Sequence, residues 1–283
     1  MLLNRWLVIV IFGLVLDLLV SGIQVAHGYI LPAEQIIEFV TKQTTRVYNF
    51  RIEVRAETPD PEYPETTIRR AMVYYAARPD YLRQEMVGEA EGGTVLVGTG
   101  QRLSVIDGHL VAERPRHEDI FPLLLHANSP ETLRALLAAE QVDLSQVHLS
   151  RLGSQIAYVI GGPPGNTEAP QFWCDKENFW PLRLIGLRSD HGVTDLVDIR
   201  FLSYQKITES VWLPREIEFY RQNRLVLRLV VEKIRYNERL PDSLFDLEKF
   251  AAQYPPLPLP KEPAEKPTEA LEEMRRYLEK KYE

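Results

Sequence analysis

The sharpest local cluster of ionisable side chains in the sequence contains Arg114, Arg116, His117, Glu118 and Asp119. Histidine and carboxylate groups so close together could exchange protons with a substrate as general acids and bases. The same residues are typical of a solvated loop before a helix, because acidic side chains stabilise the first turn of a helix. We interpret the cluster as such a loop.

The common catalytic motifs are missing from the sequence. It contains no H-E-x-x-H zinc motif, no G-x-S-x-G turn and no P-loop. We therefore expect no enzyme, no metal and no cofactor, although carboxylates that the fold brings together stay open as a further possibility. The histidines after the N-terminal segment are scattered, without a second ligand four positions away on a predicted helix: His109, His117, His126, His148 and His191.

Composition narrows the classes of partner. The 283-residue chain is 45% hydrophobic and 26% charged, with a formal net charge of −7. No dense block of Lys and Arg is present, which argues against a nucleic-acid partner. Cys174 is the single cysteine, so neither an intramolecular disulfide nor a Cys-based zinc site can form. We expect Cys174 to be a small buried core residue, since a reactive thiol would need a nearby base.

The N-terminal segment 1–28 has the pattern of a signal peptide. Arg5 supplies a positive charge, an apolar run follows, and Ala26–Gly28 offers the small residues that a signal peptidase reads. Fourteen Leu, Ile, Val or Phe residues lie between Leu7 and Val25. Asp17 opposes membrane insertion by only about 3 kcal/mol. We expect export with cleavage after Gly28, and an uncleaved membrane anchor is the alternative.

The pattern of residues 29–250 predicts a single, mainly β domain. Short runs with period-two alternation recur along this segment, most of them joined by short turns such as Asp107–Gly108. Helices are expected only near residues 32–47, 119–126 and from Ser129 onward. A sheet with one apolar face must be covered. We predict an α+β, mainly β fold, in which helices cover the concave face of a curved antiparallel sheet, an incomplete barrel.

Two segments carry the clearest apolar strand faces, residues 50–56 and 225–231. Because side chains alternate between the two faces of a strand, each segment presents a continuous apolar stripe. Three short helices are expected to leave part of the concave face unfilled. The candidate lining of the resulting ligand cavity is Phe50, Ile52, Val54, Leu225, Leu227, Leu229 and Val231.

The composition changes near the C-terminus. Residues 251–267 are rich in proline and predict an extended linker, and residues 268–283 are rich in Glu, Lys and Arg and predict a charged helix. Leu271, Met274 and Leu278 form only a thin apolar stripe on this helix. We expect a solvated tail; a helix that docks on a partner is the alternative.

Several short motifs occur in an order that is similar to one known family. The first is an apolar strand followed by Arg-Pro and a second strand with Leu-Arg, at Met72–Arg83. The second is an apolar strand ending in aspartate, a turn, and a strand whose proline precedes a basic residue, at Phe172–Arg183. The third is Trp212–Ile217, followed by a final strand, Asn237 and Leu244-Phe245. Over residues 36–247 the chain resembles the periplasmic carriers of outer-membrane lipoproteins, the LolA/LolB-like family.

This resemblance implies an incomplete antiparallel barrel with a helical lid, whose cavity receives the acyl chains of lipoproteins during outer-membrane biogenesis. It predicts a periplasmic binder or carrier of lipid or lipidated protein. The same fold also serves in sensors of envelope stress, so an envelope sensor or scaffold is the alternative, with a protein partner bound through the fold and the C-terminal tail. The Pro-rich linker and charged helix depart from the family pattern, and no functional arginine is carried over.

Overall fold

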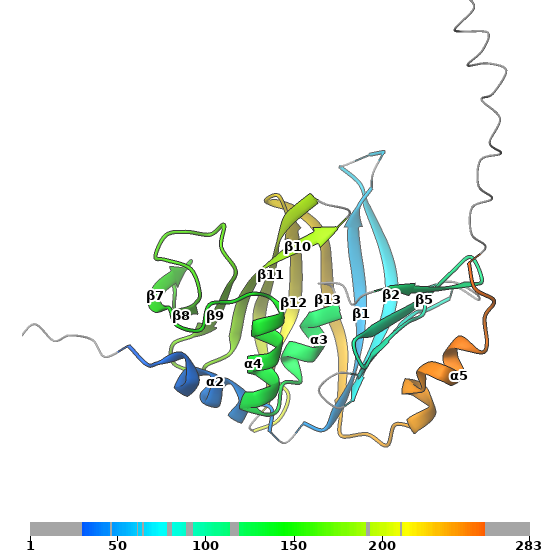
Figure 1. The fold of residues 1–283 in the computed structure, drawn as a ribbon, viewed down its shortest axis with the longest axis horizontal. Coiled ribbons are helices and arrows are strands. Elements are labelled where there is room, and N and C mark those ends of the chain that lie inside the picture. The colour runs from blue at the N-terminus through cyan, green and yellow to red at the C-terminus, as the bar shows by residue number, and fades with distance from the viewer. Residues whose placement is uncertain are drawn as a thin grey trace, which may run out of the picture.

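One open antiparallel sheet dominates the computed structural model (Figure 1), with 13 strands in the part of the chain that is described. The structure describes residues 30–45, 47–60, 62–63, 65–77, 81–88, 93–113, 119–190, 193–209 and 211–257, without the side chains of residues 188–190 and 193–195. The predicted signal segment and charged tail lie outside these residues. The predicted mainly β class, with an unclosed curved sheet and covering helices, is confirmed.

The strands form two meanders. The first comprises β1 (Asn49–Pro59), β2 (Thr67–Ala77), β3 (Tyr81–Met86), β4 (Val95–Gly98), β5 (Gln101–Ile106) and β6 (His109–Glu113). The second comprises β7 (Val147–Leu152), β8 (Gln155–Ile160), β9 (Gln171–Asp175), β10 (Pro181–Asp190), β11 (Val193–Lys206), β12 (Trp212–Arg221) and β13 (Arg224–Tyr236).

Pairing between β1 and β13 joins the two meanders in the middle of the sheet. The strand order is β6-β5-β4-β3-β2-β1-β13-β12-β11-β10-β9-β8-β7, so β6 and β7 form the two ends. The β1–β13 ladder runs from Phe50 opposite Tyr236 to Glu57 opposite Arg228, with a bulge at Glu53/Val54. Every other pair of neighbouring strands is consecutive in the sequence.

Helices α2 (Ala33–Lys42), α3 (Ile120–Leu125) and α4 (Pro130–Ala139) cover the concave face (Figure 1). The hydroxyl of Ser129 accepts a hydrogen bond from the backbone N–H of Thr132, and Pro130 occupies the first turn, as a helix start requires. The first helix is shorter than predicted, because the chain turns after Lys42. The three helices and β1 share one apolar core. Ile36, Phe121 and Leu133 enter it from the helices, and Phe50 and Ile52 enter it from β1.

The C-terminal part of the domain packs on the opposite, convex face. Leu96 of β4 points away from the main core, whereas its neighbours Val95 and Val97 point into it. The 3-10 helix η2 (Asp242–Phe245) and helix α5 (Leu247–Ala251) lie over this region, where Phe250 is buried. The domain therefore has apolar clusters on both faces of the sheet at this end.

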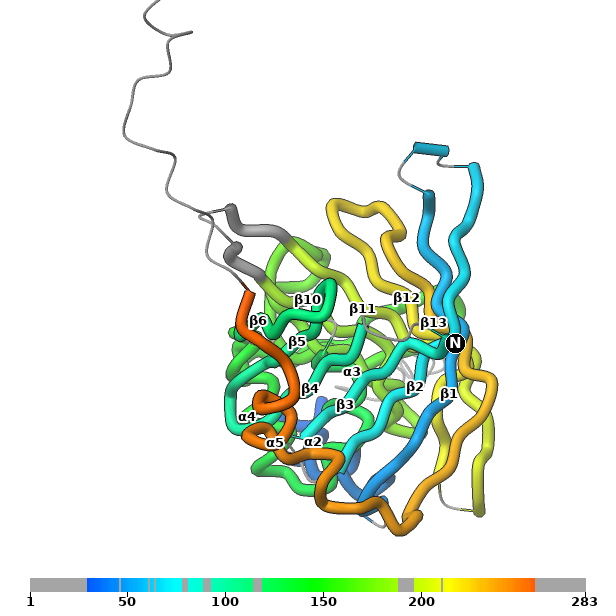
Figure 2. Tube along the Cα trace, turned by 90° about the vertical axis from the view of Figure 1, so that its right-hand side faces the viewer, coloured from blue at the N-terminus to red at the C-terminus, as the bar shows by residue number. Residues whose placement is uncertain are grey.

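After α5 the chain returns to the edge of the sheet at β6. The N–H of Leu110 donates to the carbonyl oxygen of Pro255 at 2.7 Å, and the N–H of Leu257 donates to Leu110 at 3.0 Å. Figure 2 shows this orange segment beside β6. Pro256 has no N–H, but this parallel bridge uses its neighbours instead. The first part of the predicted linker thus pairs with the sheet.

Candidate functional site

A cavity of about 270 Å³ lies on the concave face of the first meander. Its apolar wall is formed by five side chains from four strands. All of them occupy alternate positions that face the helices, as period-two geometry requires. These residues are Ala56 of β1, Met72 and Tyr74 of β2, Met86 of β3 and Leu227 of β13.

Polar side chains complete the lining: Thr58, Arg70, Gln84, Arg102 and Asp119. The Nε atom of Arg102 on β5 lies 3.1 Å from a carboxylate oxygen of Asp119, and its Nη1 lies 2.8 Å from Glu113. Arg102 and Asp119 are 7% and 3% exposed. This buried ion pair connects β5 to the residue directly before α3, so it fixes the start of that helix beside the cavity.

Only one member of the ionisable cluster seen in the sequence belongs to the described residues. Asp119 is buried and paired, so the interpretation of this residue as part of a solvated loop is wrong. Arg114, Arg116, His117 and Glu118 lie outside the described part of the chain. Arg102 was not identified from the sequence as the partner of Asp119. Arg102 precedes Leu103 in a strand with alternating side chains, and the sequence alone does not show that the side chain of Arg102 is buried.

Of the seven predicted cavity residues, Leu227 lies at the cavity itself. Phe50, Ile52, Val54, Leu229 and Val231 are at most 4% exposed and contribute to the packed core.

Leu225 faces the other way. The ladder between β12 and β13 shifts at Phe219/Tyr220, so that Leu227 pairs with Phe219 whereas Leu225 pairs with Tyr220. Phe219 is buried in the main core, and Tyr220 bonds to Glu218 on the convex side. The predicted continuous stripe from Leu225 to Val231 is therefore wrong at its first residue.

A second pocket, of about 440 Å³, lies on the convex side, between the ends of β1, β2 and β3 and the segment that contains η2. Tyr48, Tyr81 and Phe245 line it together with Asp242. Tyr48 is 68% exposed, so part of this wall projects into solvent. The smaller cavity is the better candidate for an apolar ligand, because apolar side chains of four neighbouring strands form its wall on the concave face.

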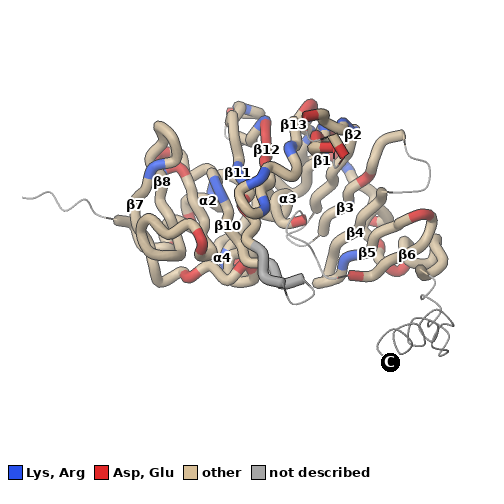
Figure 3. The backbone as a smooth tube through the Cα atoms, turned by 90° about the horizontal axis from the view of Figure 1, so that it is seen from above, with Lys and Arg blue, Asp and Glu red and all other residues tan. Residues whose placement is uncertain are grey.

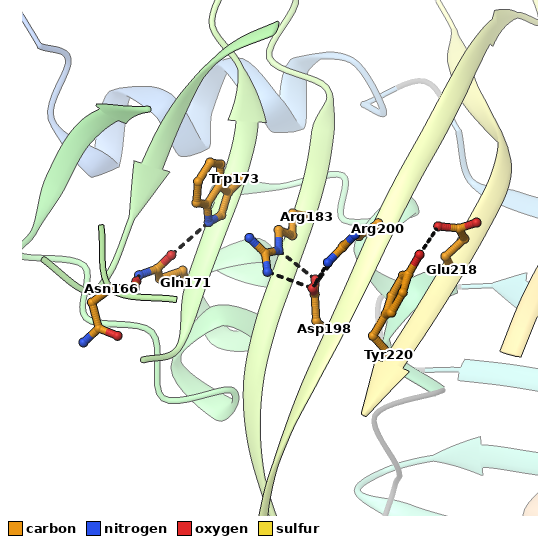
Figure 4. A network of polar contacts seen from close by, with 8 residues as sticks. All are labelled: Asn166, Gln171, Trp173, Arg183, Asp198, Arg200, Glu218 and Tyr220. Carbon is orange, nitrogen blue, oxygen red and sulfur yellow. Dashed lines mark hydrogen bonds and ion pairs between the residues drawn. The ribbon is translucent and has the colours of Figure 1, made fainter. Parts of the chain in front are cut away.

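The strongest polar network lies on the convex face (Figure 4). Both oxygens of Asp198 accept hydrogen bonds from Arg183 at 2.8 Å, and Arg200 donates to one of them. On the next strand, Glu218 accepts from Arg228 and from the hydroxyl of Tyr220. Guanidinium groups thus occupy both carboxylates, and the network stabilises the alignment of β10 to β13 rather than offering a free acid or base.

Charges of both signs are interspersed over β12, β13, β1 and β2 (Figure 3). Cys174 is fully buried, as predicted, and burial raises the pKa of its thiol far above the usual range. Among the described residues, no group of His, Cys, Asp and Glu could hold a metal ion. None of the helices described here is long and apolar enough to cross a membrane.

Comparison with solved structures identifies the fold. A LolA superfamily protein from Nitrosomonas europaea superposes with a TM-score of 0.51 at 15% identity, covering 77% of this chain and 99% of that one. A domain named for outer membrane lipoprotein sorting, from Vibrio parahaemolyticus, gives 0.51 at 12% identity, with coverage of 76% and 98%. A DUF1329 family protein from Desulfovibrio piger gives 0.51 at 13% identity, with coverage of 77% and 98%.

The chain therefore has a LolA-like fold, as the order of its sequence motifs predicted. At these levels of identity the similarity defines the fold alone. No family model and no curated protein matches the sequence.

Proposed function

We propose that this protein is an exported, non-enzymatic binder or carrier of lipid or lipidated protein, which holds an acyl chain in the cavity on its concave face. The observation that supports this is the apolar wall of Ala56, Met72, Tyr74, Met86 and Leu227 on the concave face of the sheet. Each CH2 group that leaves water for such a wall gains about 0.8 kcal/mol. The LolA-like fold supports the same class of ligand, since two similar structures are named for LolA and for lipoprotein sorting.

The test is to purify the protein from the envelope of exporting cells and to identify co-purifying molecules by mass spectrometry. We expect extractable acyl lipids or a lipidated peptide at close to one equivalent. A fluorescent fatty acid should bind the delipidated protein and be displaced by the extracted material. Protein that carries nothing lipidic and binds no acyl probe would contradict the proposal.

Export rests on the predicted signal segment, which lies outside the described residues. We propose a periplasmic location with cleavage after Gly28, and retention as an inner-membrane anchor is the alternative. N-terminal sequencing of protein from the envelope separates them: a chain that starts at Tyr29 supports cleavage, and an intact Met1 in the membrane pellet supports the anchor.

A second candidate is an envelope sensor or scaffold. The observation that favours it is the dense packing of the concave face, where Phe50, Phe121 and Phe219 are at most 1% exposed. A scaffold needs no vacant interior, and its partner would contact the fold or the C-terminal tail. Failure of every acyl probe, together with retained binding of an envelope protein to the folded domain, would favour this candidate over the carrier.

A further inference from the structure

The two edge strands of the sheet, β6 and β7, differ in how the backbone groups on their outer sides are paired. At β6, the segment Pro255–Leu257 satisfies the outer backbone groups of Leu110. At β7, the strand that pairs with it is β8, and no other strand among the described residues lies on its outer side. Figure 3 shows β7 at one extreme of the molecule, with β6 at the other. An unpaired edge is a template for a further strand.

The alternation of hydrogen bonds along β7 shows which of its residues have backbone groups that point away from β8. The N–H of Gly161 donates to the carbonyl oxygen of Gln146 at 2.9 Å, and the register continues with His148 opposite Val159. In an antiparallel pair, alternate residues bond to the neighbour and the residues between them point outward. Gln146, His148 and Ser150 therefore bond to β8. The backbone groups of Val147, Leu149 and Arg151 point to the free side.

The side chains at this edge are also unprotected. Leu149, at the centre of the three outward positions, is 37% exposed, and Ile156 on β8 is 39% exposed. The strand has the sequence VHLSRL, without proline or lysine. Natural edge strands usually carry such residues, or a bulge, to prevent association. Its one charged residue, Arg151, lies away from the centre.

We propose that β7 pairs antiparallel with β7 of a second copy of this chain, around a twofold axis at Leu149. Only this register matches outward backbone groups to outward backbone groups at all three positions. It places Leu149 opposite Leu149 of the second copy and Val147 opposite its Arg151. Each such pair exchanges two main-chain hydrogen bonds. No like charges face each other, and the exposed leucines bury one another, so the edge is self-complementary.

The pairing of Leu110 with the C-terminal segment limits assembly at β6. A chain with two free edges could add copies indefinitely, whereas a chain with one free edge stops at two. Because Pro255–Leu257 occupies the outer side of Leu110 in the five-residue strand β6, the expected product is a closed dimer with one continuous sheet. The concave cavity lies among β1, β2, β3 and β13, away from β7, and stays accessible in both copies.

Cysteine cross-linking tests the axis directly. Cα atoms of a hydrogen-bonded antiparallel pair lie about 5.5 Å apart, within the range of a disulfide. In the full protein, Leu149→Cys should form a covalent dimer under mild oxidation. The matched control is Arg151→Cys on the same strand and face, whose two copies would be separated by about 13 Å in this register and should stay monomeric on a non-reducing gel. The buried Cys174 does not compete.

Sedimentation velocity on the unmodified protein gives the second readout. We expect a reversible monomer–dimer equilibrium, with no larger species. Leu149→Pro should abolish it without unfolding, because the N–H that it removes points outward. A dissociation constant of about 100 μM would already be weak for a specific interface. A protein that stays monomeric at every concentration up to this value would overturn the proposal. The edge would then be expected to pair with an extended peptide of another protein. Equal cross-linking of the two cysteine variants would overturn it as well.

Discussion

The carbonyl oxygen of Leu110 accepts a hydrogen bond at 3.0 Å from the N–H of Leu257, near the end of the described chain. Together with the bond from Leu110 to Pro255, it forms an isolated parallel bridge at the edge of the sheet beside β6. Side chains of Phe250 and Tyr254 pack on the adjoining convex face, with their ring centroids 5.5 Å apart. The segment after α5 is therefore part of the domain.

Truncation should separate this segment from the residues that follow it. Removing residues 258–283 should leave the melting temperature unchanged within about 2 °C. Removing residues 255–283 deletes two hydrogen bonds of about 1 kcal/mol each and should lower it by about 4–8 °C. Light scattering should then also detect association, because the β6 edge is exposed. If both truncations melt alike, the pairing with β6 contributes nothing to stability.

A pair of leucine substitutions tests the proposal that the cavity binds an acyl chain. Leu227→Glu places a charge in the cavity wall and should reduce binding of a fluorescent fatty acid more than tenfold, since burial of an unpaired carboxylate or loss of apolar contact costs several kcal/mol. Leu225→Glu is the matched control, two residues away on the opposite face. It should bind as the unmodified protein does. Equal loss in both variants would point to a general effect on folding.

These two leucines also show what the sequence could and could not predict. The strand 225–231 and its apolar alternation were predictable from period two. The bulge at Phe219/Tyr220 was not, because it depends on the register with β12 and carries no residue signature of its own. One extra residue reverses the face of every side chain beyond it. Period two therefore predicts the face of each side chain only as far as the pairing with the neighbouring strand is regular.

The ion pair beside α3 allows a stability test. Arg102→Met leaves the 3%-exposed Asp119 without its guanidinium partner and should lower the free energy of unfolding by about 3 kcal/mol, measured by urea denaturation. Replacing both partners, as Arg102→Met with Asp119→Leu, removes the buried carboxylate as well. The double variant should therefore be more stable than Arg102→Met alone. A loss equal to the sum of the two single variants would show that the residues do not interact.

Thiol reactivity checks the interior of the second meander. Burial, with the charge of Asp175 as a smaller cause, raises the pKa of Cys174, so no thiolate forms near neutral pH. The folded protein should not react with Ellman's reagent at pH 8, and the urea-unfolded protein should release one equivalent. Glu209→Cys supplies an exposed thiol for comparison and should react at once. Rapid reaction of native Cys174 would mean that this part of the core opens readily.

Long-range relationships were the part of the site that the sequence could not provide. Strand and helix positions follow from local periodicity, and the order of motifs gave the fold. The cavity wall joins Ala56 of β1 to Leu227 of β13, whose proximity depends on how the two meanders meet. The convex position of η2 and α5 likewise follows from packing against Leu96, and no local pattern distinguishes the two faces there.

The β1–β13 ladder has a consequence for how fast the protein folds. Every other ladder closes a short loop, but this one joins the two ends of the sheet-forming chain, with Asn49 and Tyr48 bonded to Glu238 and Asn237. Closing so long a loop costs conformational entropy before any contact compensates for it, and non-local pairing slows folding. A circular permutant that joins residue 257 to residue 30 through a flexible linker and opens the chain between β6 and α3 would keep α2, η2 and α5 and would greatly shorten the loop that this ladder closes. Its refolding rate in stopped-flow experiments should exceed that of the natural order, even if its stability is no greater.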